Sequence, residues 1–389
     1  MPRYPFKDPW KRIAVGWFDA LGRICFLPLR ARHKTLDLAA VRRVLVIRLD
    51  HIGDVVMSRP AIRALHKKFP HAAIDLLVTG DIAPLFASSK EIRSVIAAKH
   101  GWFDRKASFA QKWSEFWRLV GIVKAGSYDV GIDLRGDIRN ILLMFLGQIK
   151  HTIGYGITGA GFLLNDEVLH DADQHQVKLN LNLLSSFHVA QDNKLLPFEY
   201  SSETAQQFWK KIDVLPPTTL LPRIALHMGS GYPSKRWPFE NFRALIQQID
   251  REALAQIVLI GTESEKAAAP DLKLNSERLI DLRGKTTLKE LPILLDVCDV
   301  FIGNDSGPAH IAAAQGLEVL LLVSGTNDIR LWHPWTERLT LLQHEVPCSP
   351  CGAEICPVEE HPCVELITVD QADQAIGAVL NRLQKRSAS

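Results

Sequence analysis

Short runs of consecutive apolar residues recur along the chain, and each is followed by a polar loop and then by apolar positions three or four residues apart. The first run is 44–47, a helical pattern follows over 55–69, and a second run occupies 74–78. Uninterrupted apolar runs are typical of strands that are buried on both faces of a parallel sheet. Because parallel strands require a crossover, this strand, helix, strand order predicts a βαβ unit.

The same alternation continues along the chain and predicts an α/β protein. A helix rich in Trp and Phe is expected over 108–124, and further strands are expected at 129–134, 224–227, 257–260, 279–281, 300–303 and 319–323. Two polar or turn-rich stretches, 191–194 and 216–219, divide the strands into two series. We therefore predict two Rossmann-like domains whose parallel sheets face each other across a cleft.

These breaks predict four parts of the chain: a basic amphipathic leader (1–42), an N-terminal domain (43–217), a C-terminal domain (218–367) and a final helix (368–389). The final helix is expected to begin at Thr368, because Gln371 is placed to complete a capping box. We expect this helix to pack back towards the N-terminal domain.

The composition is that of an ordinary soluble protein. Apolar residues make up 47% of the 389 residues and charged residues 23%, as in typical globular domains. The formal net charge of +3 is too small to indicate nucleic acid as a partner. The chain lacks a stretch of about 18 uninterrupted apolar residues. The cytoplasm is therefore the expected location, where cysteines stay reduced.

The leader differs from the rest of the chain in charge. Residues 1–43 contain ten Lys or Arg and three Asp, a net charge of 10 − 3 = +7, which leaves 3 − 7 = −4 for the remainder. Asp19 and Arg23 interrupt its apolar positions, so neither a membrane span nor a signal peptide is expected. Two interpretations stay open. The leader lies on an anionic membrane surface, on the cytoplasmic face of the inner membrane, or it is a helix packed on the first domain.

Ligands of α/β sheets bind at the carboxyl ends of the strands, which directs attention to three loops. The first is 50–54, which contains Gly53 and ends in Asp54 at the start of a predicted helix. The alternative for Asp54 is an ordinary helix cap. With one glycine where a dinucleotide fingerprint needs three, the loop does not predict bound NAD.

The second and third loops carry groups suited to phosphate. Loop 228–238 contains Ser230, Gly231 and the adjacent cations Lys235 and Arg236, and it lacks the order of residues in a Walker loop. Its alternative is a solvated surface loop.

Loop 303–310 leads into a helix, and backbone N–H groups at such a helix start form an anion site. Here the alternatives are caps for Asp305 and Ser306 and an interior histidine for His310.

The chain resembles glycosyltransferase family 9, the lipopolysaccharide heptosyltransferases. The resemblance is carried, in the family's order, by VLVIRLDHIGDVVMSRPAIRALHKKFP, LHMGSGYPSKRWPFENF, IGTESE and CDVFIGNDSGPAHIAAAQG. It covers residues 43–370 and implies a GT-B fold, with the acceptor bound by the N-terminal domain and the nucleotide sugar by the C-terminal domain. It also implies inverting transfer without a metal or other cofactor, with ADP-heptose as the donor and a lipopolysaccharide core or related glycolipid as the acceptor.

The resemblance also implies roles for individual residues. Asp54 matches the proposed general base, and Lys235 matches the lysine that meets the donor diphosphate and shares in catalysis. Ser230 and the neighbouring Gly231 lie near the phosphates, and either Glu263 or Glu265 contacts the ribose. The donor loop is matched by Asp305, Ser306, Gly307 and His310.

Cations near strand ends of the N-terminal half suit a phosphorylated or carboxylated glycolipid. We expect Arg48, His51, Arg59, Arg135 and Arg139 to bind the acceptor. The alternative for the arginines is that they solvate helix faces.

Four cysteines near the end of the chain, Cys348, Cys351, Cys356 and Cys363, suggest a structural metal site. Their spacing departs from the common zinc patterns, so we expect no metal and keep a structural site as the minor alternative. Two other functions also stay open. A sugar-nucleotide epimerase shares this architecture, and a non-catalytic nucleotide-binding scaffold would need neither Asp54 nor Lys235.

Overall fold

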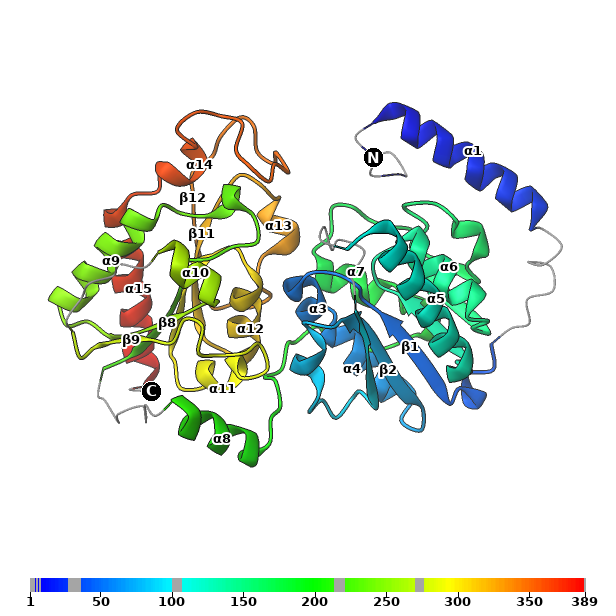
Figure 1. The fold of residues 1–389 in the computed structure, drawn as a ribbon, viewed down its shortest axis with the longest axis horizontal. Helices are drawn as coiled ribbons and strands as arrows, with labels where there is room; N and C mark the ends of the chain where they lie inside the picture. The colour runs from blue at the N-terminus through cyan, green and yellow to red at the C-terminus, as the bar shows by residue number, and fades with distance from the viewer. Residues whose placement is uncertain are drawn as a thin grey trace. The chain divides into compact units, whose positions relative to one another are not determined.

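The computed structural model describes residues 4, 6, 8–26, 36–99, 107–212, 221–269 and 276–387. The chain divides into two compact units, Met1–Lys194 and Leu195–Ser389. Each unit is built on one six-stranded parallel sheet, which confirms the predicted α/β class. Figure 1 shows the first unit in blue to green and the second in green to red.

The sheet of the first unit has the order β3-β2-β1-β4-β5-β6. Its strands are β1 (Arg43–Ile47), β2 (Ala73–Thr79), β3 (Ser94–Ala98), β4 (Val130–Asp133), β5 (His151–Gly154) and β6 (Asp166–Glu167). The strands run parallel throughout, with β1 between β2 and β4. The sequence pattern predicts three of these strands and misses β3, β5 and β6, which are short or only partly apolar.

Helices cover both faces of this sheet (Figure 1). They are α3 (Ile52–Met57), α4 (Arg59–Lys68), α5 (Phe109–Gly126), α6 (Ile138–Leu146) and α7 (Gln176–Asn182). The single helix predicted over 55–69 is two helices, because the chain breaks at Ser58 and restarts with Pro60 in the first turn of α4. Helices α5 and α6 pack on one face through a core that contains Leu45, Ile47 and Val123.

Helix α1 (Pro9–Cys25) packs on the first unit. The buried Asp19 accepts hydrogen bonds from the Tyr4 hydroxyl at 2.8 Å and from the Ala160 backbone N–H at 2.7 Å. Phe18 meets Phe162 edge to face, with ring centroids 5.4 Å apart. The helix is therefore attached to this unit. Some of the basic residues of the predicted leader lie outside the described residues.

The sheet of the second unit has the order β12-β11-β10-β7-β8-β9. Its strands are β7 (Arg223–His227), β8 (Gln256–Ile260), β9 (Leu279–Asp281), β10 (Val300–Asn304), β11 (Glu318–Val323) and β12 (Leu339–Gln343). Its helices are α8 (Ser202–Ile212), α9 (Phe239–Arg251), α10 (Glu263–Ala268), α11 (Leu291–Leu295), α12 (Gly307–Gln315), α13 (Ile329–Trp332), α14 (Pro362–Glu365) and α15 (Val369–Ser387). The first five of these strands occur where the apolar runs predict them.

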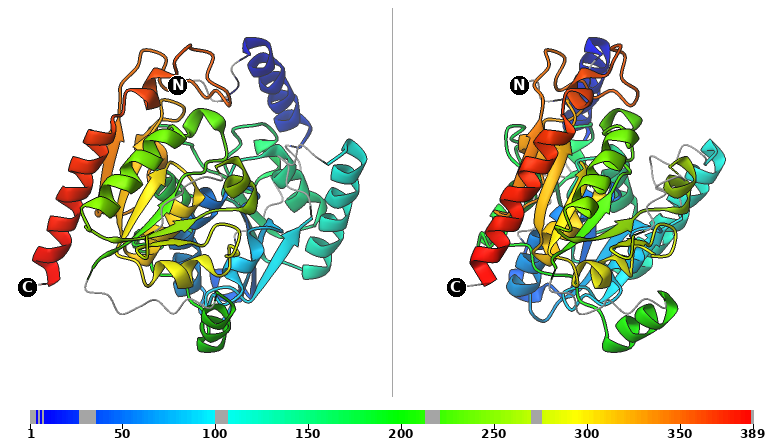
Figure 2. Two further views of the ribbon diagram at one scale, coloured as in Figure 1. Left: turned by 60° about the vertical axis from the view of Figure 1, so that its left-hand side comes forward. Right: turned by 90° about the vertical axis from the view of Figure 1, so that its left-hand side faces the viewer.

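The final helix begins as predicted but packs elsewhere. Thr368 and Gln371 form the expected reciprocal pair of hydrogen bonds at the start of α15. The helix runs alongside α9 (Figures 1 and 2). Its apolar residues Ala372, Ile376 and Val379 lie in the core of the second unit. The expectation that it packs back towards the N-terminal domain is therefore corrected, because its apolar stripe is buried on its own sheet.

The boundary between the units also differs from the expectation. The position predicted between residues 217 and 218 lies outside the described residues, and the compact units divide earlier, after Lys194. Helix α8 belongs to the second unit, since Lys211 Nζ lies 2.9 Å from Glu290 and the Tyr200 hydroxyl bonds to Asp296. In the part of the chain that the structure describes, no helix is long and apolar enough to cross a membrane.

Candidate functional site

Each sheet has one point where its strand order reverses, and the predicted loops lie there. In the first unit this point lies between β1 and β4, and in the second between β7 and β10. The loops that leave neighbouring strands there turn to opposite faces, which opens a crevice at their carboxyl ends. The loop that carries Asp54 follows β1, and the loops that carry Lys235 and Asp305 follow β7 and β10.

In the first unit, Asp54 is held by Arg48. Asp54 lies in the first turn of α3, whose N-cap is His51, so the capping interpretation of Asp54 does not apply. One carboxylate oxygen, Oδ1, is 3.0 Å from Arg48 Nη2, and the Asp54 side chain is 17% exposed. The Arg48 guanidinium also contacts the Leu134 carbonyl and lies 3.5 Å from Asn180 Oδ1. These contacts fix the direction in which the Asp54 carboxylate points.

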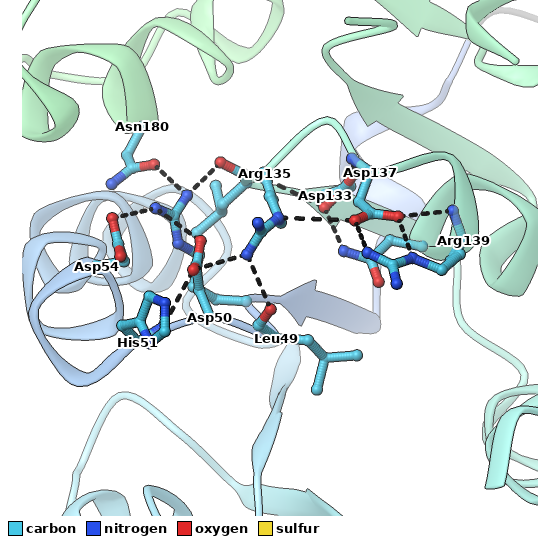
Figure 3. Close-up of polar contacts among 12 residues, drawn as sticks. Leu49, Asp50, His51, Asp54, Asp133, Arg135, Asp137, Arg139 and Asn180 are labelled. Carbon is cyan, nitrogen blue, oxygen red and sulfur yellow. Dashed lines mark hydrogen bonds and ion pairs between the residues drawn. The ribbon is translucent and has the colours of Figure 1, made fainter. Parts of the chain in front are cut away.

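A second carboxylate, Asp50, extends these contacts into a chain of ion pairs (Figure 3). Asp50 Oδ2 lies 3.4 Å from Arg48 Nη2, and Asp50 Oδ1 lies 2.6 Å from Arg135 Nη1. Arg135 Nε is in turn 3.7 Å from Asp137, which pairs with Arg139 at 2.5 Å. Strand β4 supplies the anchor, since Asp133 accepts from the Arg135 backbone N–H at 3.1 Å. The sequence analysis identified the loop that begins with Asp50 but gave neither Asp50 nor Asp137 a role.

The environment of Asp54 raises its pKa. Burial is the largest cause, and the neighbouring Asp50 carboxylate adds to it, whereas Arg48 works in the opposite direction. A carboxylate with a raised pKa is a stronger base than a solvated one. Burial likewise raises the pKa of Asp133, to about 6, but this side chain accepts from Asn140 and from backbone N–H groups. The hydrogen bonds of Asp133 are therefore made within the fold, whereas Asp54 accepts from Arg48 through Oδ1.

The structure brings together only some of the cations expected to bind an acceptor. Arg48 is 2% exposed, and its guanidinium is paired with Asp54 and Asp50. Arg135 and Arg139 keep 25% and 39% of their side chains exposed beside that cluster. His51 is exposed at the start of α3. Arg59, at the start of α4, interacts electrostatically with Glu91.

In the second unit, Lys235 and Asp305 form a close ion pair. Lys235 Nζ lies 2.6 Å from Asp305 Oδ2, and the side chains are 14% and 8% exposed. The buried Ser230 hydroxyl donates to the Asp305 carbonyl at 3.4 Å. Gly231 is exposed, and a Cβ added there would meet open space. The solvated-loop interpretation therefore does not hold for Lys235.

Asn304 holds these two loops together, and the sequence analysis missed its role. Its side-chain oxygen accepts from the Trp237 backbone N–H at 2.9 Å, and its side-chain amide donates to the Met228 carbonyl at 2.8 Å. Trp237 is 1% exposed and its indole N–H donates to Ile367. The signal in the sequence was an asparagine that ends an apolar strand, because a buried amide there needs hydrogen-bond partners.

Helix α12 directs its N-terminus at the same place. Ser306 is its N-cap, but its hydroxyl makes no capping hydrogen bond and lies instead 3.2 Å from His227 Nδ1. Gly307 begins the helix, with small residues after it. His310 is buried, and burial is the main cause that lowers its pKa to about 4, so it is neutral at pH 7. Among the described residues its Nδ1 has no hydrogen-bond partner.

Glu265, rather than Glu263, lies in this site. Its Oε1 is 3.4 Å from His227 Nε2, and its Oε2 accepts from the Thr262 backbone N–H at 2.7 Å. Burial would raise the pKa of Glu265, but the hydrogen bonds from His227 and Thr262 outweigh it and lower the pKa to about 2. The carboxylate covers Gly229, where a Cβ would come within 1.6 Å of it. The Glu263 carboxylate covers Gly284 instead.

His227 thus joins two loops of the site, and the sequence analysis did not identify it. It ends β7, is 5% exposed, and its two ring nitrogens face Ser306 and Glu265. The signal was a histidine as the last residue of an apolar strand, directly before a glycine-containing loop.

The four C-terminal cysteines lie in a segment that packs against loop 228–238, the lysine loop, which carries Lys235. The Cys351 backbone N–H donates to Gly325 at 3.0 Å, and Ser234 in the lysine loop donates from its N–H to Glu354 at 3.1 Å. As far as the structure describes the chain, none of the four forms a disulfide. Within the described ranges, no group of three or more His, Cys, Asp or Glu side chains is arranged to hold a metal ion.

Comparison with known proteins agrees with these features. The family model for glycosyltransferase family 9 (heptosyltransferase) matches residues 116–361. Lipopolysaccharide heptosyltransferase 3 of Escherichia coli is 25% identical over 305 residues, which cover 74% of this chain and 84% of that protein.

Two solved structures have the same fold. The E. coli ADP-heptose lps heptosyltransferase II has a TM-score of 0.69 at 21% identity, with 88% of this chain and 99% of that chain covered. The family 9 glycosyl transferase of Veillonella parvula has a TM-score of 0.72 at 22% identity, with 88% and 97% covered.

Proposed function

The chain belongs to glycosyltransferase family 9, the heptosyltransferase family, and from this membership we propose that it transfers heptose from ADP-heptose to a lipopolysaccharide core or related glycolipid. The observation that carries the proposal is the Lys235–Asp305 pair beside the N-terminus of α12. A cation and the N–H groups of a first helical turn at one point suit a nucleoside diphosphate. The name of the E. coli relative supports heptose and a lipopolysaccharide acceptor.

We assign donor contacts to the second unit. Lys235 neutralises the diphosphate, and Ser230, Gly231, Ser306 and Gly307 surround it. The neutral His310 lies in α12 near Asp305 and Lys235 and supports them from the buried side of the site. Glu265 accepts hydrogen bonds from the ribose hydroxyls, since its low pKa keeps it ionised near neutral pH.

In the proposed reaction, Asp54 acts as general base. It removes the proton of the acceptor hydroxyl while that oxygen attacks the anomeric carbon from the face opposite the diphosphate, so configuration inverts. The bond from the anomeric carbon to the diphosphate oxygen breaks, and the nucleoside diphosphate leaves with the electron pair. Lys235 and the α12 N-terminus stabilise the charge that develops on it. The proposed reaction uses no metal ion.

Two arginines of the first unit are placed to bind an anionic acceptor. Arg135 and Arg139 are partly exposed beside Asp50 and Asp137, and their planar guanidinium groups suit phosphate or carboxylate. We place His51 and Arg59 at the edge of the same surface. Arg48 contributes indirectly, by fixing Asp54.

We further propose that the leader holds the enzyme on the cytoplasmic face of the inner membrane, where a glycolipid acceptor is available. Helix α1 supports this, because its outward face carries Trp10, Ile13 and Trp17, each more than 60% exposed. Replacing Trp10 and Trp17 by Ser is expected to weaken binding to vesicles that contain phosphatidylglycerol. Unchanged binding would refute the role of this helix.

Calorimetric titration of the full chain with ADP, UDP, GDP and ADP-heptose tests the donor site. We expect ADP to bind selectively and the heptose to tighten binding. The variant Lys235→Ala should bind ADP more weakly, whereas Lys211→Ala, which removes another ion-paired lysine of the same unit, should not. Preference for UDP or GDP would indicate a donor sugar other than ADP-heptose. If the folded protein binds none of these nucleotides, a non-catalytic scaffold would be favoured. Release of nucleotide without glycosylation of an acceptor would indicate the epimerase.

A further inference from the structure

Helix α1 turns its apolar side outward. In an ordinary surface helix the apolar stripe faces the core and the polar side faces water. Here the buried positions are Asp19, bonded to Tyr4 and Ala160, and Gly22, while an apolar stripe at helical spacing is solvent-facing. Its members are Trp10 (66% exposed), Ile13 (62%), Trp17 (68%), Leu21 (59%) and Ile24 (71%). Packing on the first unit therefore does not explain the stripe.

Helix α5 of the same unit repeats this arrangement. Its inner side already fills the core through Phe116, Leu119 and Val123. A second stripe at i, i+4 and i+8 faces outward: Phe109 (82% exposed), Trp113 (54%) and Trp117 (48%). Trp113 stacks on Phe109 with centroids 6.3 Å apart and meets Trp117 edge to face at 5.8 Å. Figures 1 and 2 show α1 and α5 as outer helices of this unit.

Positive charge is concentrated in the same two parts of the sequence. Residues 1–43 carry +7, and residues 99–112, which lead into α5, carry four Lys or Arg and one Asp, a net +3. The rest of the chain therefore carries 3 − 7 − 3 = −7. Beside the stripes themselves, Lys11 lies over the Trp10 ring at 5.5 Å. Exposed Trp and Phe flanked by cations are typical of surfaces that enter the interface of an anionic membrane.

We infer that α5 is a second membrane-contacting element, which inserts Phe109, Trp113 and Trp117 into the headgroup region of an anionic bilayer alongside the stripe of α1. A second copy of the chain fits less well, because a symmetric contact would bring two cationic segments together. The inference rests on the proposed function in two respects: α1 is the first membrane contact, and a glycolipid acceptor would lie in the same membrane.

Vesicle flotation with the full chain tests the inference. The test variant is Phe109→Ser with Trp117→Ser, and the matched control is Leu169→Ser with Ile355→Ser, which removes two exposed apolar residues that lie outside both helices, 91% and 73% exposed. With vesicles of phosphatidylcholine and phosphatidylglycerol, we expect about tenfold weaker partitioning of the test variant and unchanged partitioning of the control. Vesicles of phosphatidylcholine alone should bind all three proteins weakly.

Hydrogen exchange locates the contact. Anionic vesicles are expected to slow exchange of the backbone amides of α5 over 109–120 as well as those of α1. Protection of α1 alone, or equal partitioning of the test variant and wild type, would overturn the inference. A change in oligomeric state of the test variant without vesicles would also overturn it, in favour of self-association. ADP titration of the same proteins separates failure of the inference from failure of the proposed function. If the test variant binds ADP as wild type does but has lost membrane binding, the inference is supported. If wild type does not bind ADP, only the proposed function is rejected.

Discussion

Removal of Arg48 should change the pH at which the enzyme becomes active. The acid limb of kcat/KM reports ionisation of the general base in the free enzyme, which is assigned to Asp54. The pKa of Asp54 is already raised, by burial and then by Asp50, and Arg48 opposes that rise from 3.0 Å. Arg48→Gln removes the opposing charge, so the carboxylate should hold its proton to a higher pH and the acid limb should move upward.

The size of this shift follows from the geometry. A cation next to a carboxylate lowers its pKa by about 1–3 units. Arg48 divides its charge between Asp50 and Asp54, and Asp54 is 17% exposed, so we expect the lower end, about 1 unit or about 1.4 kcal/mol. Arg48→Lys keeps the charge and should shift the limb by less. Since Arg48 is buried, removal of its side chain should also lower stability by about 3–5 kcal/mol.

The assay is transfer from ADP-heptose to a glycolipid acceptor over a range of pH, on variants first shown to be folded by thermal unfolding. Arg93→Gln is the matched control, because it also removes an arginine from an ion pair with a carboxylate of the first unit, Asp75, away from Asp54. Its acid limb should match wild type. An unmoved limb in a folded Arg48→Gln variant would refute either the electrostatic coupling or the assignment of Asp54 as base.

Three further predictions concern the donor and the base. Asp54→Asn should bind ADP normally but lose transfer by about 10²-fold or more, and wild-type turnover would reject the base assignment. Lys235→Ala should weaken ADP binding about tenfold or more, because Asp305 is left as an unpaired carboxylate beside the diphosphate. An unchanged affinity for ADP in calorimetry would count against this donor site. His227→Phe should reduce the roughly tenfold preference for ADP over 2′,3′-dideoxy-ADP, as Glu265→Gln should, with no further loss in the double variant. Additive losses would show that His227 does not act through Glu265.

The sequence alone determined the fold class and the loops that matter. Apolar runs such as 44–47 and 300–303 predict buried parallel strands because their periodicity is a local property of the chain. The residues directly after those runs then had to lie at the carboxyl edge of a sheet. Asp54, Lys235 and Asp305 are therefore predictable from local pattern, and a family resemblance assigns their roles.

Only the tertiary structure decided which groups act together. The contacts of Arg48 with Leu134 and Asn180, and the link through His227 from Glu265 to Ser306, join segments that are far apart in the sequence. Burial likewise separated Arg48 from the partly exposed Arg135 and Arg139, although all three are arginines near strand ends. The packing of α15 and the outward stripe of α1 had the same origin. An amphipathic pattern shows that a helix has an apolar side, but the partner that covers that side is set by contacts distant in the chain.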